Sequence, residues 1–268
     1  MLIDPLSRRF MLNIGQNGLI VLMYHAIEDN NIKPTWPYAV SLQQFKNQLD
    51  LLNDQNWTTI GSDSLSSGIT NLPDKAVLIT FDDGYANNFI AFQELAKRNM
   101  KASWFVATRD IGQMSSWIDD NTPSYPLLAA SQLSEMHAAG MEIGSHTHSH
   151  SRLTQLGAEQ IDRELRESKT AIETLLNTPV ISLAYPYGQY NASVVSAARS
   201  AGYRIAFTTH SGFGLVNDDL MQVRRISIMA GDSLSIFARK LAFADNDVSW
   251  PHLGAYVYER LKDRMKTL

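Results

Sequence analysis

The sequence predicts an α/β fold, a distorted and incomplete (β/α) barrel of about seven strands. Short apolar runs, typical of buried strands, alternate with segments of helical period through most of the chain. Acids, histidines and a Pro-Tyr-Gly turn follow the ends of several of these runs, as in barrels, whose chemistry lies where the strands end. We expect one domain over residues 1–268, because no linker and no solenoid-type repeat interrupts the alternation.

The first half of the chain contains four apolar runs that predict strands. They are Leu19–Tyr24, Trp57–Ile60, Ala76–Phe81 and Ala102–Ala107. Ser41 is the expected N-cap of a helix whose inward face is Leu42, Phe45, Leu49 and Leu52. A short helix is expected at Ser64–Ile69, and apolar residues at helical spacing predict another within Tyr85–Asn99.

The second half repeats this pattern of apolar runs and amphipathic segments. The predicted strands are Met141–Ser145, Val180–Tyr185, Arg204–Thr208 and Val223–Ile228. The predicted helices are Ser131–Ala139, Ala158–Leu176, Ala192–Ala201, Ser233–Phe243 and Gly254–Lys266. Ser131 is the expected N-cap of the first of these helices, and Gly140 is its stop signal.

The composition excludes several classes of protein. Hydrophobic residues make up 44% of the 268 residues, so a sizeable core can form. The formal net charge is −4 and no basic run stands out, so we expect no nucleic-acid partner. Cysteine is absent, which excludes disulfides and thiolate chemistry and leaves His, Asp and Glu as the metal ligands.

The N-terminal segment shows no export signal. The apolar residues after Arg8 and Arg9 are soon broken by polar ones, and the run Leu19–Met23 is too short for a signal-peptide core or a membrane span. We therefore expect no transmembrane segment and a cytoplasmic location. The sequence does not predict the oligomeric state.

Asp82 and Asp83 follow the predicted strand Ala76–Phe81 directly. Burying charge without a partner is costly, so two adjacent carboxylates at a strand end need an explanation. A cation bound by one or both of them, together with other ligands, would provide it. The alternative is a helix N-cap, because acids are favoured just before a helix and Tyr85–Asn99 is predicted to be helical.

His146 and His150 are four residues apart, which points both imidazoles the same way on a helix or helical turn. With one carboxylate from Asp82 and Asp83 they form a set of two histidines and one carboxylate with an open position. Such a set suits a catalytic Zn²⁺, with Fe²⁺ or Co²⁺ as alternatives, and the spare aspartate is placed to act as general base. His148 has the wrong phase for the same cation. The alternative is a solvated polar loop.

The run Thr80–Gly84, together with the His146 and His150 spacing, resembles the polysaccharide deacetylase family, also called the NodB-homology or carbohydrate esterase 4 family. The similarity spans most of the chain, from His25 to about Ile228. The resemblance implies a distorted, incomplete barrel and removal of N-acetyl groups from amino sugars, and hence a carbohydrate substrate. Transferred by position, it implies that Asp82 is the base.

The same resemblance implies that Asp83 is the metal ligand beside His146 and His150. The family's third motif places a backbone N–H after a proline at the oxyanion, which implies Tyr187 here. The arginine of that motif is missing, because Ala184 stands in its place.

Arg225, on a later predicted strand, is our candidate for the missing guanidinium. The alternative for Arg224 and Arg225 is an exposed charge pair. For the segment around Tyr187 the alternative is an ordinary Pro-Gly turn.

The family's last motif, an apolar strand ending in a histidine that acts as general acid, is absent from the C-terminal third. Leu19–Tyr24 followed by His25 has that form at the other end of the chain. We infer a circular permutation, which resembles poly-N-acetylglucosamine deacetylases and implies that His25 protonates the leaving amine. The alternative is a core histidine bonded to backbone.

Two other functions stay open at this point. One is a deformylase or amidase acting on a lipid-linked sugar or small molecule, and the other is an inactive carbohydrate-binding protein, which the missing arginine suggests. Five aromatic residues in predicted loops are candidates for stacking on sugar rings or for ordinary core positions. They are Trp36, Tyr38, Trp117, Tyr125 and Tyr190.

Overall fold

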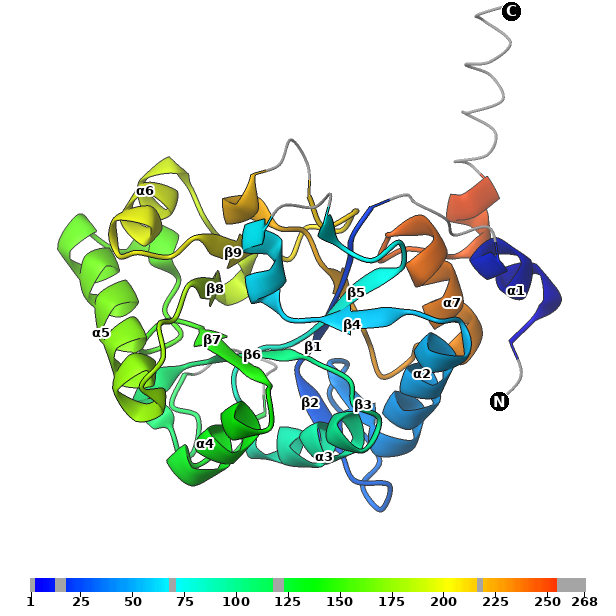
Figure 1. Ribbon diagram of the computed structural model, residues 1–268, viewed down its shortest axis with the longest axis horizontal. Helices are drawn as coiled ribbons and strands as arrows, with labels where there is room; N and C mark the ends of the chain where they lie inside the picture. The colour runs from blue at the N-terminus through cyan, green and yellow to red at the C-terminus, as the bar shows by residue number, and fades with distance from the viewer. Residues whose placement is uncertain (1–2, 13–17, 68–70, 118–122, 216–218, 255–268) are drawn as a thin grey trace, which may run out of the picture.

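The computed structural model describes residues 3–12, 18–67, 71–117, 123–215 and 219–254, and its centre is a curled parallel sheet (Figure 1). Seven strands follow one another in the order β10, β1, β5, β6, β7, β8 and β9, and β4 pairs with β5 beside this path. The strands are β1 (Ile20–Tyr24), β4 (Thr58–Ile60), β5 (Ala76–Phe81), β6 (Ser103–Val106), β7 (Glu142–Ser145), β8 (Ser182–Ala184), β9 (Ile205–Phe207) and β10 (Ile226–Ser227).

The predicted fold class is confirmed, because the curled sheet forms a half-barrel with helices around it (Figure 1). The strand order ends at β9 and β10. A single parallel bridge from Phe207 to Val223, just before β10, spans part of the distance between them. Within the described residues the barrel therefore remains incomplete.

Helices cover the outside of the sheet, and most lie where the apolar spacing predicts them. They are α1 (Pro5–Leu12), α2 (Leu42–Asp54), α3 (Phe89–Lys97), α4 (Ala130–Ala138), α5 (Ala158–Leu176), α6 (Ala192–Ser200) and α7 (Leu234–Phe243). Ser41 caps α2 as predicted, because its side chain accepts a hydrogen bond from the Gln44 N–H. The short helix expected at Ser64–Ile69 is a 3-10 segment at Ser62–Ser67, and residues 68–70 lie outside the described ones.

The predicted N-cap at Ser131 is wrong. Helix α4 begins at Ala130, so Ser131 lies inside its first turn. The cap residue is Ala129, and the side chain of Gln132 accepts a hydrogen bond from its N–H at 2.9 Å. The Gln132 side chain thus satisfies the backbone N–H of the cap residue itself.

Among the α-helices and strands of the described residues, three have no counterpart in the prediction. The first is α1, which packs on α7. The others are β2 (Ala26–Glu28) and β3 (Ala39–Ser41), which form a small parallel sheet of their own beside the strand end of β1. The helix expected at Gly254–Lys266 lies outside the described residues, apart from its first residue. No helix of the described chain is long and apolar enough to cross a membrane.

The strands are buried on both faces. Every residue of β1 and of β5 is buried, which explains why these runs are continuously apolar rather than alternating. At the N-terminal end of the half-barrel, the Glu142 carboxylate accepts hydrogen bonds from the hydroxyls of Ser62, Ser103 and Ser182. The candidate functional residues lie at the opposite end of the half-barrel, beside the carboxyl ends of the strands.

Candidate active site

The register of the sheet brings together residues that are far apart in the sequence. Tyr24 lies opposite Phe81 in the pair of β1 and β5, so His25 and Asp82 are the next residues of two neighbouring strands. The Asp82 N–H donates to the Tyr24 carbonyl at 3.0 Å, which continues the pairing by one residue. Residues after β7, β8 and β10 reach the same edge of the sheet, because all the strands are parallel.

Asp82 and Asp83 have different partners because the backbone turns sharply after β5. Asp83 has φ +71° and Gly84 has φ +82°. A Cβ at position 84 would lie 2.8 Å from a methyl of Val106, so the turn requires glycine there. The helix N-cap interpretation is wrong, because the helical segment after β5 begins only at Ala86 and no side chain caps it.

Asp83, His146 and His150 lie together, and each is at least nine-tenths buried. The Nε2 atoms of His146 and His150 lie 3.4 Å and 3.1 Å from Oδ1 of Asp83. One ligand atom from each residue lies within 4.8 Å of the others, and this is the only such group in the described part of the chain. The three side chains are therefore close enough to share one cation.

The histidines do not converge through a helical turn, so that part of the prediction is wrong. Residues 146–150 form a loop in which Thr147 has φ +65° and His150 has φ +59°. The loop is tied to its neighbours by backbone bonds from Thr108 N–H to the Thr147 carbonyl and from Arg109 N–H to the His148 carbonyl. Two left-handed residues, rather than the period of a helix, bring the two imidazoles together.

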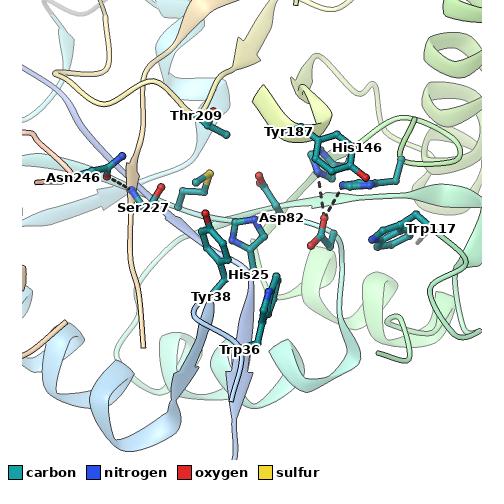
Figure 2. A pocket seen from close by; sticks show the side chains of 13 residues that line it. His25, Trp36, Tyr38, Asp82, Trp117, His146, Tyr187, Thr209, Ser227 and Asn246 are labelled. Carbon is teal, nitrogen blue, oxygen red and sulfur yellow. Dashed lines mark hydrogen bonds and ion pairs between the residues drawn. The ribbon is translucent and has the colours of Figure 1, made fainter. Parts of the chain in front are cut away.

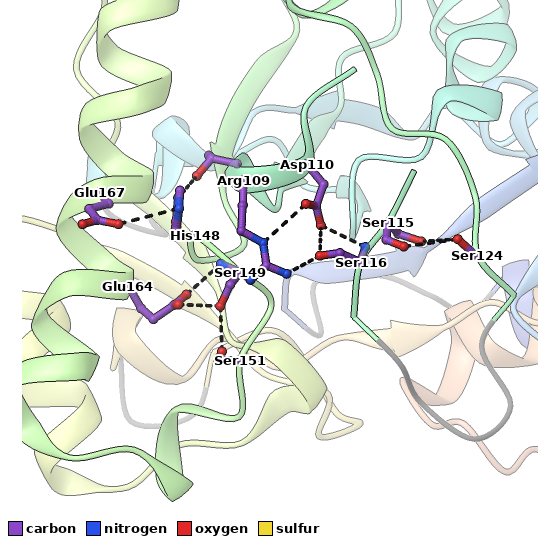
Figure 3. Close-up of polar contacts among 11 residues, drawn as sticks. Arg109, Asp110, Ser115, Ser116, Ser124, His148, Ser149, Ser151, Glu164 and Glu167 are labelled. Atoms are coloured by element: carbon purple, nitrogen blue, oxygen red, sulfur yellow. Dashed lines mark hydrogen bonds and ion pairs between the residues drawn. The ribbon is translucent and has the colours of Figure 1, made fainter. Parts of the chain in front are cut away.

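His148 is not part of the cluster, as predicted, and lies against α5 instead (Figure 3). Its Nδ1 lies 3.1 Å from the Thr108 hydroxyl, and its Nε2 lies 3.6 Å from a carboxylate oxygen of Glu167 on α5. The neighbouring Ser149 donates its N–H and its hydroxyl to Glu164 of the same helix. These contacts hold the histidine loop against α5.

The donor set fits a divalent cation. Nδ1 of His146 lies 2.8 Å from the Ala184 carbonyl oxygen, which places a proton on Nδ1 and turns Nε2 toward Asp83. Burial alone would raise the pKa of the Asp83 carboxyl, but its bonds to His146 and His150 hold that pKa well below its usual value. Two imidazole nitrogens and one carboxylate, with room for a further ligand, are typical of catalytic sites for Zn²⁺ and similar ions.

Asp82 is paired with Arg225. The guanidinium donates two parallel hydrogen bonds, from Nη1 to Oδ1 at 2.6 Å and from Nη2 to Oδ2 at 2.7 Å. Arg225 is fully buried, and its Nε donates to the Thr208 carbonyl at 2.9 Å. Burial alone would raise the pKa of Asp82, but the charges of Arg225 and His146 outweigh it and lower that pKa. Arg225 is therefore not part of an exposed charge pair.

His25 lies between Asp82 and two aromatic rings (Figure 2). Its ring centroid is 5.7 Å from that of Trp36 and 4.9 Å from that of Tyr38. Its Nδ1 is buried and has no hydrogen-bond partner among the described residues, so His25 is not a core histidine bonded to backbone. Burial lowers the pKa of this imidazole, although the charges of Asp83 and Asp82 oppose the shift.

Tyr187 lies in the 3-10 segment Pro186–Gly188 and has φ +58°. Its ring makes an edge contact with His150, with centroids 4.8 Å apart, and the Arg152 guanidinium lies 3.5 Å from its centre. A Cβ at Gly188 would collide with Thr209, so the segment is packed tightly in place. The backbone of Tyr187 is thus held beside the metal cluster.

One cavity of about 400 Å³ is lined by the metal cluster together with Asp82, His25 and Tyr187 (Figure 2). Arg225 lies behind Asp82 and does not line the cavity. Of the five aromatic candidates, Trp36, Tyr38 and Trp117 line the cavity. The other two do not: the Tyr125 hydroxyl donates to Glu28 at 2.6 Å, and the Tyr190 hydroxyl donates to Gln222 at 2.9 Å.

The cavity has a polar wall opposite the metal cluster that was not predicted from the sequence, and Thr209, Ser227 and Asn246 form it (Figure 2). The Ser227 N–H donates to Oδ1 of Asn246 at 2.8 Å, and Lys240 donates to the Ser227 carbonyl at 2.8 Å. No motif marks these residues. Ser227 is the last residue of β10, and this place at a strand end is the one signal that could have drawn attention to it.

Comparisons with known proteins agree on one family. The polysaccharide deacetylase family model matches residues 70–206. YxkH of Bacillus subtilis, named as a candidate polysaccharide deacetylase, is 30% identical over 223 residues, which cover 82% of this chain and 74% of that protein. The poly-β-1,6-N-acetyl-D-glucosamine N-deacetylase of Staphylococcus aureus is 24% identical over 243 residues, which cover 81% of each chain. The solved structure of the deacetylase PplD of Streptococcus pyogenes, in complex with acetate, has a TM-score of 0.73 and 25% identity, over 84% of this chain and 98% of that one.

Proposed function

The chain belongs to the polysaccharide deacetylase family, and from that premise we propose that it is a metal-dependent hydrolase that removes N-acetyl groups from an amino sugar of a polysaccharide. The observation that carries this proposal is a single cavity lined by a candidate metal cluster, an aspartate paired with a buried arginine, and a histidine. Amide hydrolysis needs these three parts, because it requires an activated water, a base and a proton for the leaving nitrogen.

Asp83, His146 and His150 would hold the cation, which we propose to be Zn²⁺, with Fe²⁺ or Co²⁺ as alternatives. When bound, the ion supplies Lewis-acid chemistry, which polarises the acetyl carbonyl and lowers the pKa of a water. The open side of this cluster faces the cavity, so a substrate carbonyl entering it would meet the cation and Asp82 together.

Asp82 is the general base in this proposal. It takes the proton of the attacking water, and its low pKa keeps it ionised and ready to do so. Arg225 holds both carboxylate oxygens, so it fixes the plane of the base and balances its charge within the protein. Arg225 does not line the cavity, and we assign it as a positioning residue.

Tyr187 and His25 complete the site. The Tyr187 N–H donates a hydrogen bond to the oxyanion that develops as the carbonyl is attacked. His25 donates a proton to the departing nitrogen, because an unprotonated amide nitrogen is a very poor leaving group. The products are acetate and a free amine on the sugar. Acetate is also the molecule bound in the related PplD structure.

The substrate that we propose is a polymer of N-acetylated amino sugars. The named activity of the Staphylococcus aureus relative supports this class. Trp36, Tyr38 and Trp117 at the cavity wall provide flat apolar faces of the kind that stack on sugar rings. The comparisons do not favour a deformylase or an inactive binding protein. The predicted cytoplasmic location stays a prediction, which fractionation of the producing cells would test.

The test is acetate release from N-acetylglucosamine oligomers of β-1,6 and β-1,4 linkage. We expect release by the zinc-loaded chain, loss of release with a chelator and recovery when Zn²⁺ is restored. The variant Asp82→Asn is expected to retain bound metal and lose turnover, whereas His150→Ala is expected to lose the metal itself. Full turnover of Asp82→Asn, or release that a chelator does not affect, would contradict the proposal.

A further inference from the structure

The two histidines of the candidate metal cluster are held in different ways. Nδ1 of His146 has the Ala184 carbonyl oxygen as its partner, at 2.8 Å. Nδ1 of His150 is also buried, yet it has no hydrogen-bond partner in the part of the chain that the structure describes. Histidines that bind metals almost always donate their second ring nitrogen to an oxygen, which fixes the orientation of the ring. His150 therefore needs another means of orientation.

Aromatic rings surround His150 instead. The ring of Trp117 stacks on it, with centroids 4.6 Å apart and an angle of 28° between the planes. Tyr187 contacts the same imidazole at its edge, with centroids 4.8 Å apart and an angle of 62°. Together these rings restrict the rotation of the imidazole, while its Nε2 faces Asp83 at 3.1 Å.

Trp117 is itself held in place by the segment before it, whose polar contacts are drawn in Figure 3. The buried Asp110 carboxylate accepts the Ser116 N–H at 3.0 Å and the Ser116 hydroxyl at 2.6 Å. One residue earlier, the Ser115 N–H donates to the Tyr125 carbonyl at 2.9 Å. A side-chain anchor and a backbone bond thus fix the chain immediately before Trp117, far from the histidine loop in sequence.

We propose that Trp117 is a positioning residue for the metal site: its stacked ring holds the His150 imidazole with Nε2 toward Asp83. This stacking does for His150 what the Ala184 carbonyl does for His146. The proposal rests on the proposed function only in taking Asp83, His146 and His150 as metal ligands. Asp110 supports the same arrangement indirectly, because it anchors Ser116 beside Trp117.

The test measures the affinity of the full chain for Zn²⁺, by competition with a chromogenic chelator, in the wild type and in variants. Trp117→Ala is expected to weaken zinc affinity by about 10- to 100-fold, as for other residues that orient metal ligands. Trp117→Phe keeps an aromatic face, so we expect it to recover most of the loss. The matched control is Trp250→Ala, because Trp250 is 46% exposed and does not line the cavity. The zinc affinity of this control should equal that of the wild type.

Wild-type zinc affinity in a folded Trp117→Ala variant would overturn the proposal, as would an equal loss in Trp117→Ala and Trp117→Phe. If Trp117→Ala does not fold, Asp110→Ala decides: weakened zinc binding supports the proposal, and unchanged binding overturns it. The measurement is separate from the enzymatic one. A wild-type chain that binds zinc and releases no acetate would refute the proposed deacetylase activity while leaving the effect of Trp117 on zinc binding measurable.

Discussion

Replacing Arg225 by methionine tests how much the buried ion pair between Arg225 and Asp82 contributes to stability and turnover. The guanidinium supplies both hydrogen bonds to the Asp82 carboxylate, at 2.6 Å and 2.7 Å, and Asp82 is only 2% exposed. Removing one partner of a buried pair leaves the other charge uncompensated, which typically destabilises a protein by about 3–5 kcal/mol. We expect Arg225→Met to lower the free energy of unfolding by about this amount.

A second substitution separates the charge from the volume of the side chain. In Arg225→Met combined with Asp82→Asn no buried charge remains, so the double variant is expected to be more stable than Arg225→Met alone. Arg225→Lys keeps the charge and loses the two parallel bonds, and its stability should lie between those of the wild type and Arg225→Met. The control is Arg224→Met, because Arg224 is adjacent and contacts neither aspartate through any described bond.

Urea denaturation measures the stabilities, and acetate release measures the effect on turnover. Turnover of Arg225→Met should fall by about 100-fold or more, because the base loses its fixed orientation. Equal stability of Arg225→Met and the wild type would refute the electrostatic argument. Stability that falls further in the double variant than in Arg225→Met would refute it too.

Two further predictions concern parts of the fold outside the cavity. Glu142→Ala leaves the hydroxyls of Ser62, Ser103 and Ser182 without their shared acceptor, so it should lower the free energy of unfolding by about 1–3 kcal/mol. Urea denaturation measures this change against the exposed control Glu135→Ala, and equal effects of the two substitutions would contradict the prediction. At Glu94, burial alone would raise the pKa, but hydrogen bonds from Lys97 and Arg98 lower it to about 2. A carboxyl whose pKa is lowered on folding stabilises the protein above its unfolded pKa, and this stabilisation is lost as the pH falls toward the folded pKa. The stability advantage of the wild type over Glu94→Gln, followed by thermal unfolding, should therefore be full at pH 7 and shrink below about pH 4.5; a difference that stays constant down to pH 3 would contradict it.

The sequence predicts the fold well where apolar runs are continuous. β5 and α5 have the predicted bounds, because a fully buried strand and a long amphipathic helix carry strong periodic signals. β2 and β3 were missed because each is only three residues long, and β3 directly precedes the N-terminal end of α2. Strands this short pair through their tertiary neighbours rather than through a pattern of their own.

The residues of the candidate site were found by motif, but their local geometry was not. The spacing of His146 and His150 suggested a helical turn, whereas left-handed φ angles at Thr147 and His150 produce the convergence. Such angles are set by surrounding contacts, so at a non-glycine residue they are hard to predict from the sequence. Thr209 and Asn246 were missed for a related reason, because they reach the cavity from loops that only the curled sheet brings near.

The pairing of Arg225 with Asp82 joins residues 143 positions apart, and only the absence of an arginine at Ala184 suggested it. The sheet explains it: β10 and β5 both flank β1, so residues beside their ends lie near each other. The roles that we assign to these residues stay predictions until the variants are measured.

The central claim is that Asp83, His146 and His150 hold one divalent cation. Anomalous diffraction at the zinc absorption edge, from crystals of the zinc-loaded chain, tests it most directly. We expect one strong anomalous peak in contact with a carboxylate oxygen of Asp83 and with Nε2 of both histidines. A fully loaded crystal with no peak at these three atoms, or with its zinc bound elsewhere, would show that they do not form the metal site.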